Sequence, residues 1–213
     1  MKRITDNQQI KTTLNYNTMI PQIDTLKDYQ SSKNNTIENM KWEIDPSHSE
    51  VMFKIKHLEI ASITGRFDEI KGTAEAEEDF ENAVFSFSAA INSINTNSKN
   101  RDAHLKSADF FDAEKFPKIS FYSTKFKRIG EASFEIIGRL TIKEITKPTI
   151  LHLDYGGSNI DPWGNTKAGL KFKGIINRKD YGLSWNTALE TGGVLIGEEV
   201  RINGNIELIK KLE

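Results

Sequence analysis

The chain has 213 residues, a formal net charge of −1 at pH 7 and a hydrophobic content of 37%. Basic and acidic residues are interleaved, which argues against a nucleic-acid-binding surface, and the absence of cysteine excludes disulfides, a thiolate nucleophile and cysteine-based metal sites. No stretch approaches the roughly 18 apolar residues of a membrane-spanning helix, and no apolar run of signal-peptide length follows the N-terminus. We therefore expect no membrane span, no nucleic-acid partner and a cytoplasmic location.

The first forty residues are polar and include a linker-like run at 31–35. We expect residues 1–40 to form an N-terminal extension that packs on the next domain, mediates dimerisation or is disordered in part. Apolar residues become regularly spaced from Trp42 onward, and the remaining residues, about 170, are enough for one substantial core. A single domain is therefore expected at residues 41–211.

Period-2 alternation of apolar and polar residues, typical of antiparallel strands with one buried face, dominates this domain. In chain order, the candidate strands are 42–45, 51–57, 63–76, 85–91, 119–128, 134–142, 148–155, 168–176 and 200–208. The ranges 42–45, 63–76, 119–128 and 148–155 are weaker candidates, so about eight strands are expected. Such strands bury their apolar faces by closing, and a barrel of eight is just wide enough to hold side chains or one ligand. The pattern predicts an all-β fold, an antiparallel eight-stranded barrel.

Breaks in the alternation predict the connections between these strands. One or two short helices are expected around residues 98–115, the first at 98–107 and a possible helical turn at 108–115. Glycine pairs predict turns at Gly156-Gly157-Ser158 and at Gly192-Gly193. Glycines inside the strands, at Gly72, Gly138, Gly174 and Gly204, suit the bends that a barrel needs.

The segment 100–123 combines charged and aromatic residues in a way that a simple turn does not need. Arg101, Asp102 and His104 are followed by Phe110 and Phe111, and we interpret the segment as the mouth or lid of a cavity. A capped, salt-bridged helix with Asp102 in its first turn explains the charges equally well. An enzymatic alternative, a hydrolase or isomerase of a small apolar substrate, would use Asp102 and His104 as an acid–base pair.

Other catalytic and metal-binding patterns are missing from the sequence. There is no H-x-H, HExxH, EF-hand or G-x-S-x-G motif, so we assign no metal ligand and no catalytic residue. Arg178 ends an apolar strand and has two interpretations. The favoured one is a local ion pair with Asp180; the other is a guanidinium at the barrel rim that meets a phosphate or carbonyl head group.

Several motifs taken in order resemble the YceI family of polyisoprenoid-binding, lipocalin-like proteins. The resemblance covers about residues 41–209 and is carried by 42–57, 65–67, 93–96, 101–105, 110–113, 116–117, 138–142, 146–148 and 177–182. It implies a lipocalin-like barrel around an elongated apolar pocket, often in a dimer, with polyprenyl phosphates or isoprenoid quinones as ligands. Many members are exported, so the resemblance leaves a periplasmic location open.

The expected function is to bind and sequester or carry a long-chain amphiphilic isoprenoid, without enzymatic activity or a cofactor, in a homodimer. A third hypothesis is a filled barrel that acts as an interaction module. Twelve phenylalanines, many on inward-facing strand positions, favour the cavity. The expected ligand-binding residues are Phe53, Ile55, Phe67, Phe85, Phe87, Phe121, Leu140, Leu170 and Phe172 around the tail, Phe110 and Phe111 as a cover, and Arg101, His104, His57 or Arg178 at the polar head.

Overall fold

Alternating apolar and polar residues produce the strands of this fold, because every second side chain of a strand points to the same face. The computed structural model describes residues 40–77, 80, 83–188 and 194–211. The predicted extension, residues 1–40, lies outside these ranges except for Met40, which begins the first strand. The elements are β1 (Met40–Ile44), β2 (Glu50–His57), β3 (Ala61–Phe67), β4 (Ile70–Ala76), β5 (Val84–Ala90), the 3₁₀ turn η1 (Ile91–Ser93), β6 (Ile94–Asn95), α2 (Lys99–Lys106), β7 (Lys118–Arg128), β8 (Ser133–Ile142), β9 (Ile145–Ile160), β10 (Thr166–Asn177), the 3₁₀ turn η2 (Arg178–Tyr181) and β11 (Ile196–Lys210).

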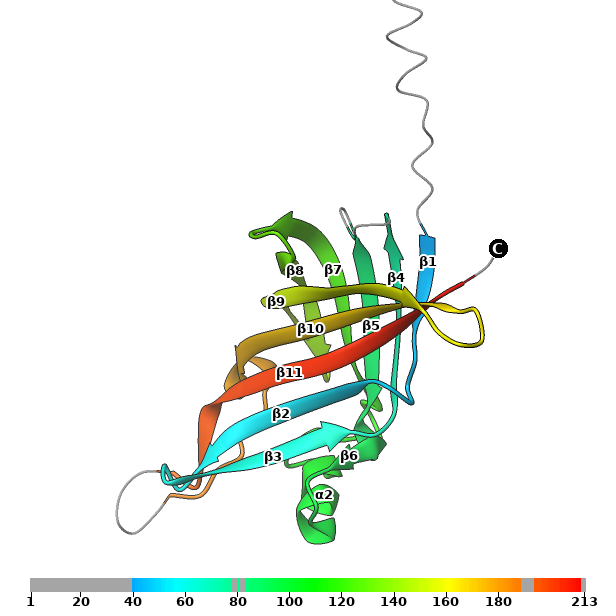
Figure 1. Ribbon diagram of the computed structural model, residues 1–213. Helices are drawn as coiled ribbons and strands as arrows, with labels where there is room; N and C mark the ends of the chain where they lie inside the picture. The colour runs from blue at the N-terminus through cyan, green and yellow to red at the C-terminus, as the bar shows by residue number, and fades with distance from the viewer. Residues whose placement is uncertain (1–39, 78–79, 81–82, 189–193, 212–213) are drawn as a thin grey trace, which may run out of the picture. The chain divides into compact units, whose positions relative to one another are not determined.

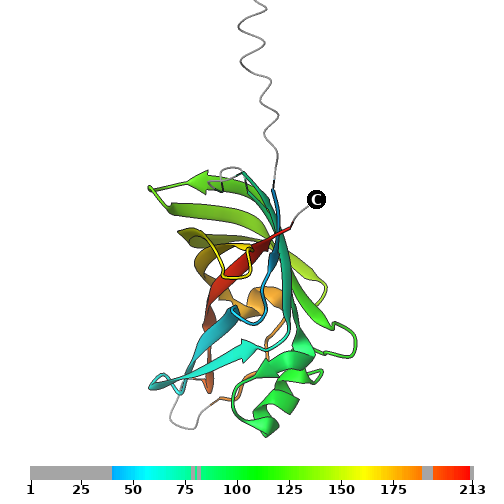
Figure 2. The same cartoon turned by 45° about the vertical axis from the view of Figure 1, so that its right-hand side comes forward.

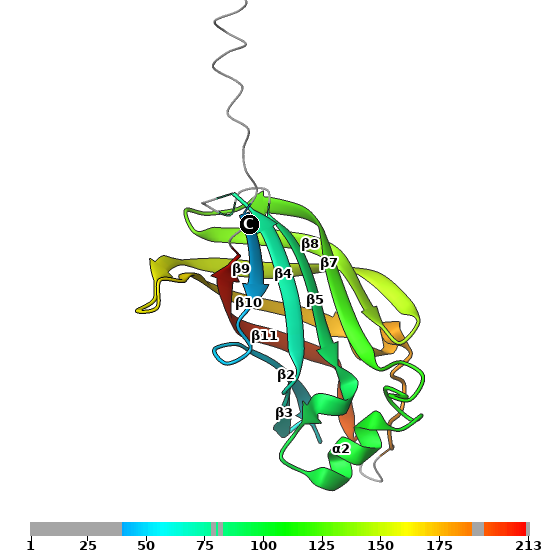
Figure 3. The ribbon, with the colours of Figure 1, turned by 90° about the vertical axis from the view of Figure 1, so that its right-hand side faces the viewer.

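Eight strands close into an antiparallel ring in the order β1-β4-β5-β7-β8-β9-β10-β11, and β11 returns to β1 (Figures 1 and 3). β1 pairs with the last residues of β11, and β2 pairs with the earlier part of the same strand. β3 pairs with β2 on one edge and with the two-residue strand β6 on the other. The predicted antiparallel eight-stranded barrel is therefore confirmed. We call the end that carries α2 and the β2–β3 turn the helix end.

The opposite end of the barrel is closed by aromatic side chains. The ring centroids of Trp42 and Phe80 are 5.2 Å apart, those of Phe80 and Tyr155 5.0 Å, and those of Phe126 and Phe134 4.6 Å. Trp42, Phe80 and Phe134 are almost completely buried. We call this the aromatic end; β1 begins and β11 ends there, away from α2 (Figures 1 and 3).

The connections follow the predictions in part. The helix expected at 98–107 is α2, whereas residues 108–115 form turns and no second helix. The turn expected at Gly156-Gly157-Ser158 is wrong: these residues lie within β9, where the pairing with β10 shifts register. A β-bulge needs the same backbone freedom as a turn, and Gly157 has a positive φ of 96°. The turn expected at Gly192-Gly193 lies outside the described residues.

Near α2, β3 lies outside the closed ring and pairs with β2 on one side and with the two-residue strand β6 on the other. Figure 2 shows α2 and the segment after it (green) beside this end of the barrel. None of the helices in the described part of the chain has the length and apolar character needed to span a membrane.

A cluster of charged side chains links β1 to β10 and β11 at the bend between β1 and β2. Lys167 Nζ donates to Asp45 Oδ2 at 2.6 Å and to Glu207 Oε1 at 3.0 Å, and His48 Nδ1 lies 3.0 Å from the same Asp45 oxygen. The bond from Lys167, followed by that from His48, holds the pKa of Asp45 well below its usual range. Asp45, His48 and Glu207 are close enough to share a metal ion, but the Lys167 ammonium already bridges the two carboxylates.

We expect Asp45→Asn to lower the free energy of unfolding by about 2 kcal/mol near pH 7, because charge-assisted bonds to Lys167 and His48 are lost. The folded-state pKa of Asp45 lies below the unfolded value of about 3.9, so its stabilisation is complete above that pH and is lost as the pH falls further. Urea unfolding of both proteins should show a difference that shrinks below about pH 4. A constant difference down to pH 3 or so would contradict an ionised Asp45.

Candidate functional site

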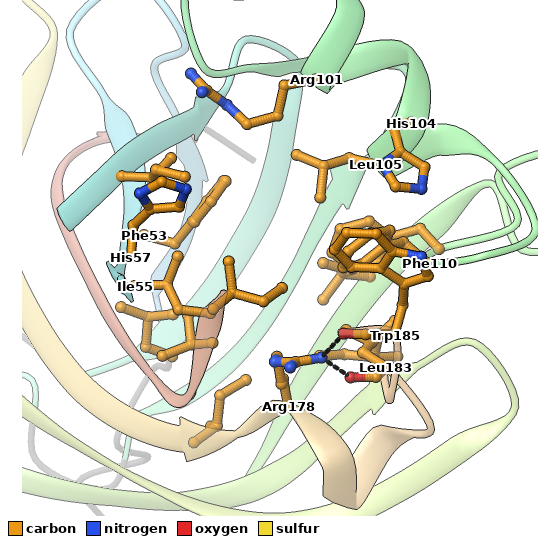
Figure 4. Close-up of a pocket in the computed structure, with 18 of the residues that line it drawn as sticks. Phe53, Ile55, His57, Arg101, His104, Leu105, Phe110, Arg178, Leu183 and Trp185 are labelled. Atoms are coloured by element: carbon orange, nitrogen blue, oxygen red, sulfur yellow. Dashed lines mark hydrogen bonds between the residues drawn. The ribbon is translucent and has the colours of Figure 1, made fainter. Parts of the chain in front are cut away.

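The helix end of the barrel encloses a cavity of about 470 Å³, within the size range of pockets that bind small molecules. Strands β2, β3, β7, β8, β10 and β11 form its walls. The helix α2 and the segment after it cover one side, and the chain after η2 covers another (Figure 4). Most of the lining side chains are aliphatic or aromatic, because the inward-facing positions of these strands are apolar. This cavity argues against the hypothesis of a filled barrel.

A second cavity of about 120 Å³ lies in the middle of the barrel. Leu140 of β8 and Ile202 of β11 line both cavities and so stand between them. An unfilled cavity of this volume costs about 3 kcal/mol of stability, at roughly 24 cal/mol per Å³. The side chains of the barrel therefore do not fill its interior completely.

The structure places all the predicted ligand-binding residues on these two cavities, although whether they bind a ligand stays a prediction. The larger cavity is lined by Phe53, Ile55, His57, Phe67, Arg101, His104, Phe110, Phe111, Leu140 and Arg178. The smaller cavity is lined by Phe85, Phe87, Phe121, Leu140, Leu170 and Phe172.

Two lining residues after η2, Leu183 and Trp185, were not predicted. They follow Gly182, whose φ of 70° ends η2, and they enter the cavity wall at alternate positions. Their spacing of two is a strand-like signal, but it is too short to stand out in a single sequence. Leu195, just before β11, and Ile196, its first residue, were not predicted either, because two adjacent apolar residues show no alternation.

Arg101 and Asp102 hold α2 in place through one residue, Thr96. Asp102 Oδ1 accepts hydrogen bonds from the backbone N and the Oγ1 of Thr96, while Arg101 donates to Thr96 Oγ1 at 2.8 Å and to its carbonyl at 2.7 Å. These bonds tie the first turn of α2 to the end of β6. Asp102 lies in the first turn of α2, as the capped-helix interpretation required, but its partner is Thr96 rather than an ion pair, and the N-cap residue Ser98 makes no side-chain cap bond.

His104 joins α2 to the chain after η2 through ring contacts. Its ring meets Phe110 edge-on at 5.1 Å and Trp185 edge-on at 4.8 Å, and its Nε2 lies 3.0 Å from Asp109 Oδ2. Figure 4 shows His104, Leu105 and Phe110 on one side of the cavity and Trp185 beside them. Since His104 is paired with Asp109 and Asp102 with Thr96, the acid–base pair of the enzymatic alternative is not formed.

Arg178 places a buried guanidinium in the wall of the larger cavity. Its Nε donates to the Gly197 carbonyl at 2.8 Å, and its Nη1 donates to the carbonyls of Leu183 and Trp185 (Figure 4). The favoured prediction of a local ion pair with Asp180 is therefore wrong, because the side chain turns toward the loop that leads to β11.

The remaining nitrogen of this guanidinium, Nη2, is buried and has no hydrogen-bond partner among the described residues. Burial lowers the pKa of Arg178, and the neighbouring Glu198 opposes that shift. A buried donor without a partner costs free energy, so the Arg178 side chain has an unused capacity to bind an acceptor.

Comparisons with known proteins agree with this architecture. The sequence model of the YceI-like domain family matches residues 42–208. A UPF0312 protein of Staphylococcus aureus strain MSSA476 is 37% identical over 165 residues, which cover 76% of this chain and 94% of that protein. The solved YceI protein of Campylobacter jejuni is 28% identical, with a TM-score of 0.64 over 75% of this chain and 91% of that one.

Two more distant solved structures share the fold. BcnA of Burkholderia cenocepacia is 16% identical, with a TM-score of 0.68 over 77% of this chain and 98% of that one. A domain from Saccharophagus degradans, described as polyisoprenoid-binding, is 13% identical, with a TM-score of 0.62 over 81% of this chain and 99% of that one. With a family match that spans the barrel and its cavity-lining strands, the chain belongs to the YceI-like family.

Proposed function

We propose that this protein binds an amphiphilic isoprenoid, a polyprenyl phosphate or an isoprenoid quinone, and sequesters or carries it in the barrel. The observation that carries the proposal is the combination of a large apolar cavity with the buried, partly unpaired guanidinium of Arg178 in its wall. Burial of an isoprenoid tail supplies affinity at about 0.8 kcal/mol for each methylene group. The polyisoprenoid-binding description of the S. degradans domain supports the same ligand class.

The polar side chains of the larger cavity supply donors for the head group. Arg178, His57, Arg101 and His104 all line it. Of these, Arg101 is bonded to Thr96 and His104 to Asp109, whereas the buried Nη2 of Arg178 has no hydrogen-bond partner in the part of the chain that the structure describes. A phosphate or a quinone carbonyl is an acceptor, so either head group fits a guanidinium donor. The predicted homodimer and the cytoplasmic location stay predictions.

Lipid extraction and native mass spectrometry test this function. We expect the purified protein to carry an isoprenoid lipid, and the delipidated protein to take up polyprenyl phosphate or quinone. Ile55→Trp should weaken uptake by about tenfold or more, because the larger side chain occupies tail space. Lys54→Trp is the matched control, since Lys54 is the neighbouring exposed residue of the same strand.

Two outcomes would contradict the proposal. One is a protein that is free of co-purified lipid and also fails to take up either probe. The other is uptake that Ile55→Trp and Lys54→Trp affect equally, since binding would then lie outside the cavity.

A further inference from the structure

We propose that the barrel selects its ligand by the length of the apolar tail, with the smaller cavity as the compartment for the tail end. This inference rests on the proposed function and adds a specificity to it. The larger cavity would hold the head group and the first part of the tail. The tail would then pass Leu140 and Ile202, the two side chains that line both cavities.

The strands show that the two cavities lie in series along the barrel. On β11, Ile196 and Val200 line the larger cavity, Ile202 lines both, and Ile206 and Leu208 line the smaller one. β8 repeats this order, from Ile142 through the shared Leu140 to Ile136. The six residue-to-residue steps from Ile202 to Leu208 span about 20 Å along the strand, and strand tilt reduces this to roughly 15 Å along the barrel axis.

The side chains that line the two cavities determine which cavity holds the head group and which holds the end of the tail. The larger one has the charged or ionisable side chains of His57, Arg101, His104 and Arg178 in its lining. Within the described residues, the lining of the smaller one contains no ionisable side chain. Of its three hydroxyl residues, Thr149 is bonded to Tyr181, and Thr73 and Ser86 are exposed. A polar head group would therefore lose its hydration without compensation in the smaller cavity, so only the tail belongs there.

The size of the smaller cavity also favours an apolar occupant. Apolar cavities of about 150 Å³ stay dry and bind small hydrocarbons, and this one has a volume of about 120 Å³. A dry cavity holds no ordered water that a tail must displace. Each tail carbon that enters it therefore gains contacts with little cost in lost hydrogen bonds.

The aromatic end supplies a floor beneath this compartment. Phe85 lines the smaller cavity, and its ring lies 6.5 Å from that of Phe80 and 5.9 Å from that of Phe126. Phe80 is fully buried and packs in turn on Trp42. A tail that reaches these rings cannot extend further along the axis, so additional isoprene units must stay at the helix end.

Binding of polyprenyl phosphates of two, three, four, six and eight isoprene units, measured by native mass spectrometry, tests the inference. For the wild type, affinity should rise with tail length and then level off once the smaller cavity is filled. Leu151→Trp fills that cavity, because Leu151 lines it and does not line the larger one. We expect this variant to reach its plateau at a shorter tail and to lose about tenfold in affinity for the longer probes, with the shortest probe unaffected.

Two further variants serve as a control and as a test in the opposite direction. Ile150→Trp is the matched control, since Ile150 is the neighbouring residue of β9 and its side chain is half exposed on the outer face. Phe172→Leu enlarges the smaller cavity, so it should move the plateau to longer tails. This opposite shift keeps the inference testable if Leu151→Trp fails to fold.

The outcomes separate the inference from the proposed function. Wild-type binding with the same affinity for all tails, or a plateau that neither cavity variant moves, would overturn length selection and leave the binding function intact. If the wild type binds no probe of any length, the proposed function itself is overturned.

Discussion

Arg178→Met should lower the free energy of unfolding by about 3 kcal/mol or more. The guanidinium satisfies the carbonyls of Leu183, Trp185 and Gly197, and a methionine leaves these acceptors without their donor. Each buried acceptor that loses its partner costs about 1–3 kcal/mol, and removal of a desolvated charge offsets part of that sum. Chemical denaturation followed by circular dichroism measures the effect.

Two other variants identify the cause of this loss. Arg201→Met also removes an arginine, but from an exposed site where the side chain pairs with Glu199, and should change stability by less than about 0.5 kcal/mol. Arg178→Lys keeps the charge and should fall between the wild type and Arg178→Met, since one ammonium group cannot replace the planar fork of donors. If Arg178→Met is as stable as the wild type, the carbonyl contacts do not hold the loop.

Gly65→Ala should destabilise the barrel by about 2 kcal/mol, because a Phe53 ring lies over this glycine. A methyl group at Gly65 would lie 2.7 Å from Phe53 Cε1 and 2.7 Å from Thr96 Cγ2, both far inside van der Waals contact. The Phe53 ring must move to remove this clash, and Phe53 lines the larger cavity. We therefore expect Gly65→Ala to weaken ligand uptake as well as to lower the melting temperature.

Gly169→Ala is the matched control for this steric effect. An added methyl group at Gly169, also in a strand, meets nothing within 4 Å and should change stability by less than about 1 kcal/mol. Phe53→Leu should recover part of the stability lost in Gly65→Ala, because two of the close contacts are with the Phe53 ring. Equal melting temperatures of Gly65→Ala and Gly169→Ala would show that the Phe53 ring moves aside without a loss of stability.

Much of the barrel was predictable because strand alternation is a local property. A residue such as Phe53 faces inward or outward according to its position in the strand, so its place on the cavity follows from the sequence. The helix α2 lies where the alternation breaks, which is why the sequence predicts a connection there. The bulge at Gly156 and Gly157 was not predictable, because a bulge and a turn both favour glycine.

The partners of the polar residues could not be predicted, since they depend on contacts between distant parts of the chain. Asp45 meets Lys167 across 122 positions of sequence, and nothing near either residue indicates the other. Arg178 turns to carbonyls that only the closed barrel brings beside it. The local ion pair with Asp180 was a reasonable expectation from neighbouring residues, but tertiary packing overrides it.

Because β3 lies outside the ring, the two ends of the barrel are held together in different ways. Toward the aromatic end, the ring of ladders is continuous through β1 and β4, so the circumference there is set by hydrogen bonds. Toward the helix end, β3 meets β6 at only Arg66 and Phe67 on its outer edge, and side-chain packing completes the wall. The wall at the helix end is therefore held by fewer backbone hydrogen bonds than the closed ring. A change in the width of the larger cavity would require β2 and β3 to bend, but it would break no strand pairing of the ring.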